Sequence, residues 1–87
     1  MFYVYILRSK VQPRQTYVGS TADLRKRLTE HNSGKSVHTN KFKPWDLQAY
    51  MALPKKQLAE QFEKYLKSGS GRAFAARHLL ESDNKSD

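Results

Sequence analysis

The sequence predicts an α+β domain, in which a small three-stranded sheet, antiparallel or mixed, is flanked by about three helices in the order β-β-α-β-α-α. Three observations support this prediction. The chain has 87 residues, which suffices for one domain. Three short runs are rich in β-branched and aromatic residues, as strands are, and other segments carry helix-start signals and apolar residues three or four apart. We expect residues 1–81 to form the domain and residues 82–87 a polar C-terminal tail.

The first predicted strand covers residues 2–7, Phe-Tyr-Val-Tyr-Ile-Leu, which are apolar or aromatic at every position. Such a run is expected of a central strand that is covered on both faces. Residues 16–19 predict a second strand, antiparallel to the first because the polar loop 8–15 between them is short. Residues 45–51 predict a third strand, in which alternate apolar side chains share one side of the sheet. These are Trp45, Leu47, Ala49 and Met51.

The first predicted helix runs from about Asp23 to Ser33 and ends at Gly34, a residue that readily adopts a left-handed cap. Leu24 and Leu28 lie four residues apart and are expected to face the core. This helix should therefore follow directly on the second strand and pack against the sheet.

Pro54 opens a second predicted helix, whose apolar residues recur at helical spacing. These residues are Leu58, Phe62, Tyr65 and Leu66, with Ala59 beside them. The run Ser68-Gly69-Ser70-Gly71 is predicted to end this helix, and residues 72–80 are predicted to form a short third one.

The charge balance indicates a polyanionic partner. The chain has 16 Lys and Arg against 8 Asp and Glu, and without residues 82–87 the balance is 15 to 6. Nucleic acid is the commonest partner of so basic a small domain. The alternative is that the charges bind no partner and only keep the protein soluble. Segment 35–43 is predicted to track phosphates through Lys35, His38, Thr39, Lys41 and Lys43, or else to be an ordinary solvated loop. Arg72, at the start of the third helix, is a further candidate for a phosphate contact.

Several classes of protein are excluded or disfavoured. The chain has no cysteine, which rules out disulfides, zinc sites built from thiolates and cysteine nucleophiles. It has no run of about 20 apolar residues, the length that a membrane-spanning helix needs. We therefore expect a cytoplasmic protein without a membrane partner.

Five ionisable residues fall near the predicted core. Tyr5 and Tyr17 lie on adjacent strands, Arg27 and His31 lie four apart on the first helix, and Glu63 lies beside the apolar stripe of the second helix. All five are therefore candidates for one face of the sheet.

Each of the five has a simpler explanation when taken alone. The tyrosines could be core residues whose hydroxyls are hydrogen-bonded, and Arg27 could be one more cation on a basic helix. His31 could stabilise a helix C-terminus, and Glu63 could pair with Lys67 four residues later.

Taken together, the five match a known pattern. Tyr3-Val4-Tyr5, followed after eleven residues by Tyr17-Val18-Gly19, resembles the paired motif of the GIY-YIG nuclease family. Residues 23–32 resemble the helix that carries the family's arginine and histidine, and residues 63–67, Glu-Lys-Tyr-Leu-Lys, resemble its metal-binding segment. The resemblance covers residues 2–80 and is closest to small stand-alone bacterial members that are related to the nuclease domain of an excinuclease.

The resemblance implies hydrolysis of DNA phosphodiester bonds with one divalent ion, Mg²⁺ or Mn²⁺. It implies that Glu63 binds the metal, that Tyr5 and Tyr17 surround the attacking water and that Arg27 holds the phosphoryl charge. His31 would assist the proton transfer. One metal and one guanidinium can supply the charge stabilisation that phosphoryl transfer needs, and a single carboxylate suits a metal that keeps most of its water.

Two other functions remain open at this stage. The chain could be a nucleic-acid-binding module that keeps the nuclease fold without catalysis, or a structural RNA-binding protein. In the nuclease interpretation, the chain has no room for a targeting domain. Its specificity is then expected to come from a protein partner or from the shape of branched or damaged DNA.

Overall fold

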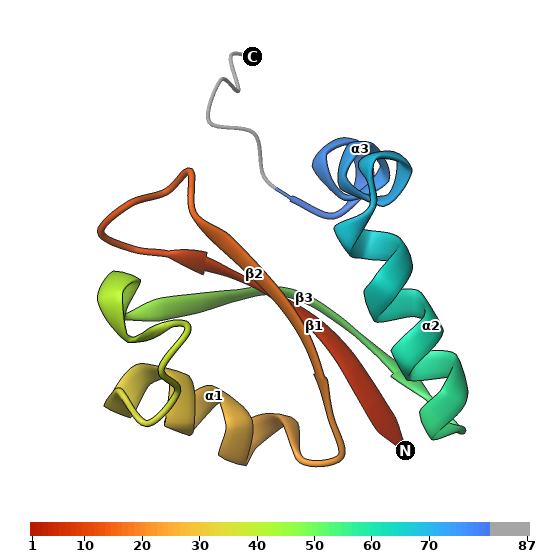
Figure 1. The fold of residues 1–87 in the computed structure, drawn as a ribbon, viewed down its shortest axis with the longest axis horizontal. Helices are drawn as coiled ribbons and strands as arrows, with labels where there is room; N and C mark the ends of the chain where they lie inside the picture. Colours follow the sequence, from red (N-terminus) through yellow and green to blue (C-terminus); the bar gives the residue numbers. More distant parts are fainter. Residues whose placement is uncertain (81–87) are drawn as a thin grey trace.

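A three-stranded antiparallel sheet separates two layers of helix (Figure 1). The computed structural model describes residues 1–80. Its elements are β1 (Phe2–Ser9), β2 (Thr16–Thr21), α1 (Leu24–Ser33), a short 3₁₀ turn η1 (Asn40–Phe42), β3 (Trp45–Leu53), α2 (Lys56–Lys67) and α3 (Gly69–His78). The strand order is β2-β1-β3, with α1 on one face and α2 and α3 on the other. The predicted α+β class and element order are thus confirmed.

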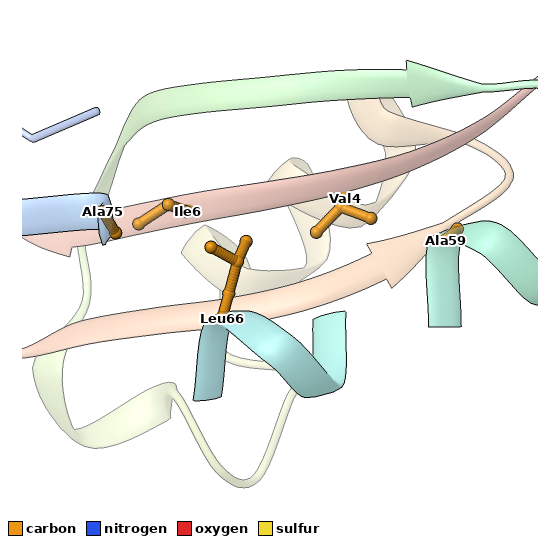
Figure 2. Close-up of a cluster of buried hydrophobic side chains, with 5 residues drawn as sticks. All are labelled: Val4, Ile6, Ala59, Leu66 and Ala75. Carbon is orange, nitrogen blue, oxygen red and sulfur yellow. The ribbon is translucent and has the colours of Figure 1, made fainter. Parts of the chain in front are cut away.

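The central strand β1 is buried on both faces, as its continuous apolar run predicted. Val4 and Ile6 face α2 and α3, where they pack with Ala59, Leu66 and Ala75 (Figure 2). The intervening Tyr5 and Leu7 point to the opposite face and pack with Trp45, beneath α1. β1 therefore supplies both hydrophobic clusters, and the two outer strands are the edges of the sheet.

The regular alternation predicted for the third strand is interrupted by a bulge. Ile6 lies opposite Ala49, but the next residue, Leu7, lies opposite Leu47, so Gln48 is an extra residue in β3. Residues that face each other across antiparallel strands point to the same side of the sheet. Leu47 therefore joins the α1 face with Trp45, whereas Ala49 joins the α2 face. The prediction that these side chains share one side is wrong, because one inserted residue reverses the side of every residue beyond it.

The predicted ends of α1 are confirmed. The Asp23 side chain accepts a hydrogen bond from the backbone N–H of Lys26 at 3.1 Å, as a helix N-cap does. At the other end Gly34 adopts a left-handed conformation with φ of 86°. Between these caps the one fully buried side chain of the helix is that of His31, and Leu24 and Leu28 are only partly buried.

The boundary between α2 and α3 is tighter than predicted. Ser68 alone separates the two helices: its Oγ accepts from the N–H of Gly71 and donates to the Tyr65 carbonyl. α3 therefore begins at Gly69, and the predicted start at residue 72 is wrong. Gly71 is buried against the end of α2, where a Cβ atom would lie 1.8 Å from the Tyr65 carbonyl oxygen. Residue 81, the predicted end of the domain, and the predicted tail 82–87 lie outside the described residues.

Replacing Gly71 with Ala should lower the free energy of unfolding by about 1–3 kcal/mol or more, because backbone atoms of α2 would have to move to admit the new methyl group. Gly69→Ala is the matched control, since no atom lies within 4 Å of a Cβ built there and Ala favours a helix. Thermal unfolding of both variants measures the difference. Equal melting temperatures for Gly71→Ala and the wild type would contradict the close approach of the two helices.

Candidate active site

Polar side chains gather around β2, which is an edge strand of the sheet. Gly19 in its middle lies opposite Tyr5, and Tyr17 lies opposite Leu7, so both tyrosines are on the α1 face. A Cβ atom at Gly19 would lie 2.6 Å from the Tyr5 hydroxyl oxygen and 2.9 Å from Cε2 of Tyr17. The absence of a side chain at residue 19 is therefore what allows the two phenol rings to lie over the strand.

A buried chain of hydrogen bonds runs from Tyr5 into the protein. The Tyr5 hydroxyl lies 2.8 Å from Nε2 of His31, and Nδ1 of the same ring lies 2.7 Å from the Thr39 hydroxyl oxygen. None of the three residues is more than 1% exposed. The Tyr17 ring packs against His31 from the edge of the sheet, with 4.9 Å between ring centroids. The structure thus brings three of the predicted catalytic residues together with Thr39, which was predicted to contact nucleic acid.

Burial shifts the pKa values of this pair in opposite directions. It raises the pKa of Tyr5 to about 12, with a further rise from the nearby Tyr17 and an opposing effect of the Arg27 charge. Burial also lowers the pKa of His31 to about 4, and the Arg27 charge adds to that shift. Near neutral pH the phenol therefore keeps its proton, while the imidazole is uncharged and has a lone pair that can accept one.

Arg27 is held beside the tyrosines by an acidic neighbour. Its Nη1 donates to Oε1 of Glu30 at 2.9 Å, one turn along α1. This hydrogen bond raises the pKa of Arg27 and lowers that of Glu30. Both side chains are about one-third exposed, so the guanidinium can reach a ligand from solvent while it remains close enough to the phenol to lower the pKa of Tyr5. Glu30 was not predicted as a site residue. Its position three residues after Arg27 on a predicted helix, where an ion pair is favoured, was the signal in the sequence that could have identified it.

Glu63 lies on the other side of the sheet from the tyrosines. It belongs to α2, and its Oε1 accepts a hydrogen bond of 2.6 Å from Ser20, which lies opposite Val4 and so is on the α2 face. The expectation that all five residues share one face is therefore wrong for Glu63. Its pair with Lys67, the simpler explanation, is present at 2.8 Å. The Ser20 bond is additional and ties the carboxylate to β2 beside Gly19.

The Glu63 carboxylate remains ionised and acts across the edge of the sheet. Burial alone would raise its pKa, but the hydrogen bonds from Lys67 and Ser20 outweigh this effect and lower the pKa below its usual value. Its negative charge in turn raises the pKa of Tyr5. The two sides of the site are thus close enough to interact around β2, although they lie on opposite faces.

The side chains around Glu63 fit a mostly hydrated divalent ion. Within residues 1–80 there is no group of three or more His, Asp or Glu side chains that could enclose a metal. Glu63 offers hard anionic oxygens, each engaged by one donor and each with lone pairs to spare. The Lys67 ammonium, a cation on an exposed side chain, already occupies one of these oxygens. A single carboxylate of this kind is compatible with a divalent ion whose main ligands are water, provided that the ion displaces the Lys67 ammonium.

The residues predicted to bind nucleic acid fall in two places, with one exception. Four of them are exposed on the segment between α1 and β3: Lys35, His38, Lys41 and Lys43. Thr39 belongs to that segment, but its side chain is buried against His31 and does not present its hydroxyl to nucleic acid. Arg72 lies on the α2 and α3 face, where it lines a cavity of about 460 Å³ together with Arg14 and Lys67. Cations therefore lie on both sides of β2.

Asn32 and Thr39 show what the sequence could not reveal. The Asn32 side chain donates to the carbonyl of Trp45 and accepts from its N–H, which fastens α1 to β3. The Trp45 indole N–H donates to the Thr39 carbonyl at 2.8 Å. These bonds fix the segment between α1 and β3 from both ends. No spacing rule connects residues of a helix, a loop and a strand in this way.

Comparison with known proteins agrees with this geometry. Residues 1–75 match the GIY-YIG catalytic domain. The chain belongs to the GIY-YIG family. The predicted family and the predicted enzyme class, a nuclease domain of the GIY-YIG type, are confirmed.

Relatives of two sizes resemble this GIY-YIG domain. It is 38% identical to structure-specific endonuclease subunit SLX1 of Candida dubliniensis, over 90% of this chain but 29% of that protein, and 36% identical to its counterpart in Debaryomyces hansenii. The chain thus spans less than a third of these proteins. A UPF0213 protein of Streptococcus pyogenes is 32% identical over 94% of this chain and 92% of its own length.

A solved structure supports the fold. The solution NMR structure of a UPF0213 protein from Bacillus halodurans superimposes with a TM-score of 0.53 and is 33% identical, covering 88% of this chain and 84% of that one.

Within residues 1–80, no helix has the length and apolar character needed to cross a bilayer. The cytoplasmic location stays a prediction.

The buried imidazole predicts how stability changes with pH. The pKa of His31 is about 4 in the folded protein and 6.5 in the unfolded chain, so the unfolded chain binds more protons between these values. The free energy of unfolding should therefore fall by about 3 kcal/mol from this residue as the pH is lowered from 6.5 to 4. Denaturant unfolding of the wild type and of His31→Gln measures the effect, because the carboxylates titrate in both proteins and cancel in the difference. A difference that is constant with pH would contradict the buried neutral state.

Proposed function

We propose that this domain is a metal-dependent DNA endonuclease that hydrolyses phosphodiester bonds beside β2. The observation that carries the proposal is the contact between the Tyr5 hydroxyl and His31, with Arg27 beside it and Glu63 at the same strand edge. This arrangement combines a proton acceptor, a fixed cation and a carboxylate that suits a divalent metal. These are the groups that phosphoryl transfer requires.

Substrate binding is proposed to begin at Arg27. Its planar guanidinium can contact two oxygens of a phosphate at once, and to do so it would exchange its bond to Glu30 for the phosphate. Tyr17, whose ring packs on His31, would border the space occupied by the attacking water. When bound at Glu63, the metal would supply Lewis-acid stabilisation of the phosphoryl charge.

Proton transfer is proposed to pass through Tyr5. A phenol with a pKa of about 12 does not ionise beforehand, so it accepts a proton from the attacking water only as it gives its own proton to His31. The water oxygen forms a bond to phosphorus, the bond from phosphorus to the leaving oxygen breaks, and that oxygen takes a proton from solvent. The low pKa of His31 keeps its Nε2 unprotonated and ready before the step.

DNA is proposed to lie across the β2 edge, with cations on either side of it. Lys35, Lys41 and Lys43 would contact phosphates on one side and Arg72 on the other. The SLX1 relatives are named as subunits of structure-specific endonucleases. This name supports a substrate chosen by its shape, such as branched or damaged DNA, and a protein partner that directs the domain to it.

A second candidate is a nucleic-acid-binding module that keeps the fold without turnover. It is favoured by the ion pairs that occupy both charged groups of the site, Arg27 with Glu30 and Glu63 with Lys67. Both pairs are partly exposed to solvent, so each is worth little energy and can be exchanged for a charged ligand. Cleavage assays separate the two candidates.

Glu63→Gln should lower the rate of DNA nicking in Mg²⁺ by at least about 100-fold, because an anionic metal ligand is lost while the shape is kept. DNA affinity should be unchanged or slightly higher, since a negative charge near the phosphates disappears. Glu60→Gln, an exposed residue of the same helix, is the matched control and should cut like the wild type. Supercoiled, flapped, branched and single-stranded DNA are the substrates. Undiminished cleavage by Glu63→Gln would leave Glu63 as a partner of Lys67 only.

The double variant Lys41→Ala, Lys43→Ala should weaken DNA binding and reduce the slope of log affinity against log salt by about 2, one unit for each lost phosphate contact. Lys55→Ala, Lys56→Ala removes the same charge at the start of α2 and is the control. Fluorescence anisotropy with labelled duplex DNA at several salt concentrations gives both slopes. An equal reduction by the two pairs would mean that only the total charge matters, and not the segment between α1 and β3.

A further inference from the structure

We propose that Thr39 is a positioning residue of this site: its hydroxyl accepts the Nδ1 proton of His31 and thereby keeps Nε2 free to accept a proton from Tyr5. The inference deepens the proposed nuclease mechanism and its catalytic part rests on it. The assignment of the His31 proton can be measured whether or not the domain cuts DNA.

The backbone of Thr39 fixes the place of its hydroxyl. Its carbonyl accepts from the Trp45 indole N–H at 2.8 Å and its N–H donates to the Ser36 carbonyl at 3.2 Å. The side chain is buried, and its hydroxyl oxygen lies 2.7 Å from Nδ1 of His31. The imidazole is thus held at both nitrogens, by Tyr5 on one side and by Thr39 on the other.

The donors and acceptors in this chain determine where the imidazole proton sits. Arg27 has only donors, so it can give a hydrogen bond to the Tyr5 oxygen but cannot accept the phenol proton. Within the described residues, the acceptor at hydrogen-bond distance from the Tyr5 hydroxyl is Nε2 of His31, at 2.8 Å. The phenol is also a stronger donor than the aliphatic hydroxyl of Thr39, so its proton is the costlier one to leave unpaired. Nε2 is therefore the acceptor, and the ring proton is on Nδ1 and bonded to Thr39.

The proposed reaction needs the imidazole proton on Nδ1 and a free lone pair on Nε2. With the ring proton on Nδ1, Tyr5 can pass its own proton to Nε2 as it takes one from water, and the resulting imidazolium donates from both nitrogens to oxygen atoms. With the ring proton on Nε2, the imidazole would instead donate to Tyr5, and the relay could not accept a proton. Without the hydroxyl, a buried Nδ1–H would have no acceptor, whereas an Nε2–H would still have the Tyr5 oxygen. The ring should therefore change to the Nε2–H form, with the Tyr5 proton turned towards the space that the attacking water occupies in the proposed mechanism.

Nitrogen-15 NMR of the imidazole at pH 7 measures this directly in the wild type, Thr39→Val, Thr39→Ser and Ser36→Ala. We expect the Nδ1–H tautomer in the wild type and in Thr39→Ser, which keeps the hydroxyl. Thr39→Val should shift to the Nε2–H tautomer. Ser36→Ala is the matched control, because it removes a buried hydroxyl of the same turn that has no hydrogen-bond partner among residues 1–80, and it should keep the wild-type tautomer.

Single-turnover cleavage at saturating protein and the dissociation constant for DNA complete the test. Thr39→Val should lower the rate by at least about 10-fold with an unchanged dissociation constant, and Thr39→Ser should restore the rate. If Thr39→Val does not fold, Thr39→Ala fits any space that Thr39 leaves and replaces it in both measurements.

Two results would overturn the proposal: a wild-type ring with its proton on Nε2, or a tautomer that is the same with and without the Thr39 hydroxyl. A wild type that cuts no DNA would refute the proposed function instead. In that case the tautomer measurement alone decides whether Thr39 positions His31.

Discussion

The buried hydrogen bond between the Tyr5 hydroxyl and Nε2 of His31 is the contact on which the site and its surroundings depend. It joins the central strand to α1, a helix whose leucines are only partly buried and whose fully buried residue is the histidine itself. Polar atoms taken from water are costly unless they are bonded, so the partners of the imidazole on both sides help to hold this helix in position. α1 is thus held on the sheet by a polar network as much as by apolar packing.

The site lies at an edge strand because it combines side chains from both faces of the sheet and must be open to solvent. β1 is covered on both faces, so any group on it reaches solvent only past a neighbouring strand. At β2 the two faces of the sheet meet the surface, and Gly19 leaves room for the Tyr5 phenol to lie over the strand. A tyrosine and an arginine from one layer and a glutamate from the other can therefore act on one ligand. Exposed edges invite pairing with other chains, and here the charged side chains beside β2 make such pairing unfavourable.

Local signals predicted the parts of the fold that depend on neighbours in sequence. The run at residues 2–7 indicated a strand buried on both faces, and Asp23 and Gly34 set the ends of α1. The bulge at Gln48 was not predictable, because it exists only in the pairing of β3 with β1. The early start of α3 was missed for a similar reason, since Gly71 looks like a helix breaker until the close approach of Tyr65 is known.

At the candidate site too, the sequence predicted some features and could not predict those that depend on the folded structure. Tyr5, Tyr17, Arg27, His31 and Glu63 were selected by their resemblance to a family pattern, which fixes their order along the chain but not the face of the sheet that each occupies. Ser20, Glu30 and Thr39 complete their hydrogen bonds. Serine and threonine are common in loops and strands of every protein, so the sequence did not distinguish Ser20, and it suggested a contact with nucleic acid for Thr39 and not its bond to His31.

The basic segment 35–43, between α1 and β3, has an exposed side and a buried side with different roles. Its lysines point to solvent, while Thr39, in their midst, points inward and supports His31. Exchanging this segment for that of a relative, in order to redirect the domain to another DNA, would thus also replace a support of the proton acceptor. A graft that keeps the backbone turn from Ser36 to Thr39 and the threonine itself, and varies only the outward residues, separates choice of substrate from chemistry.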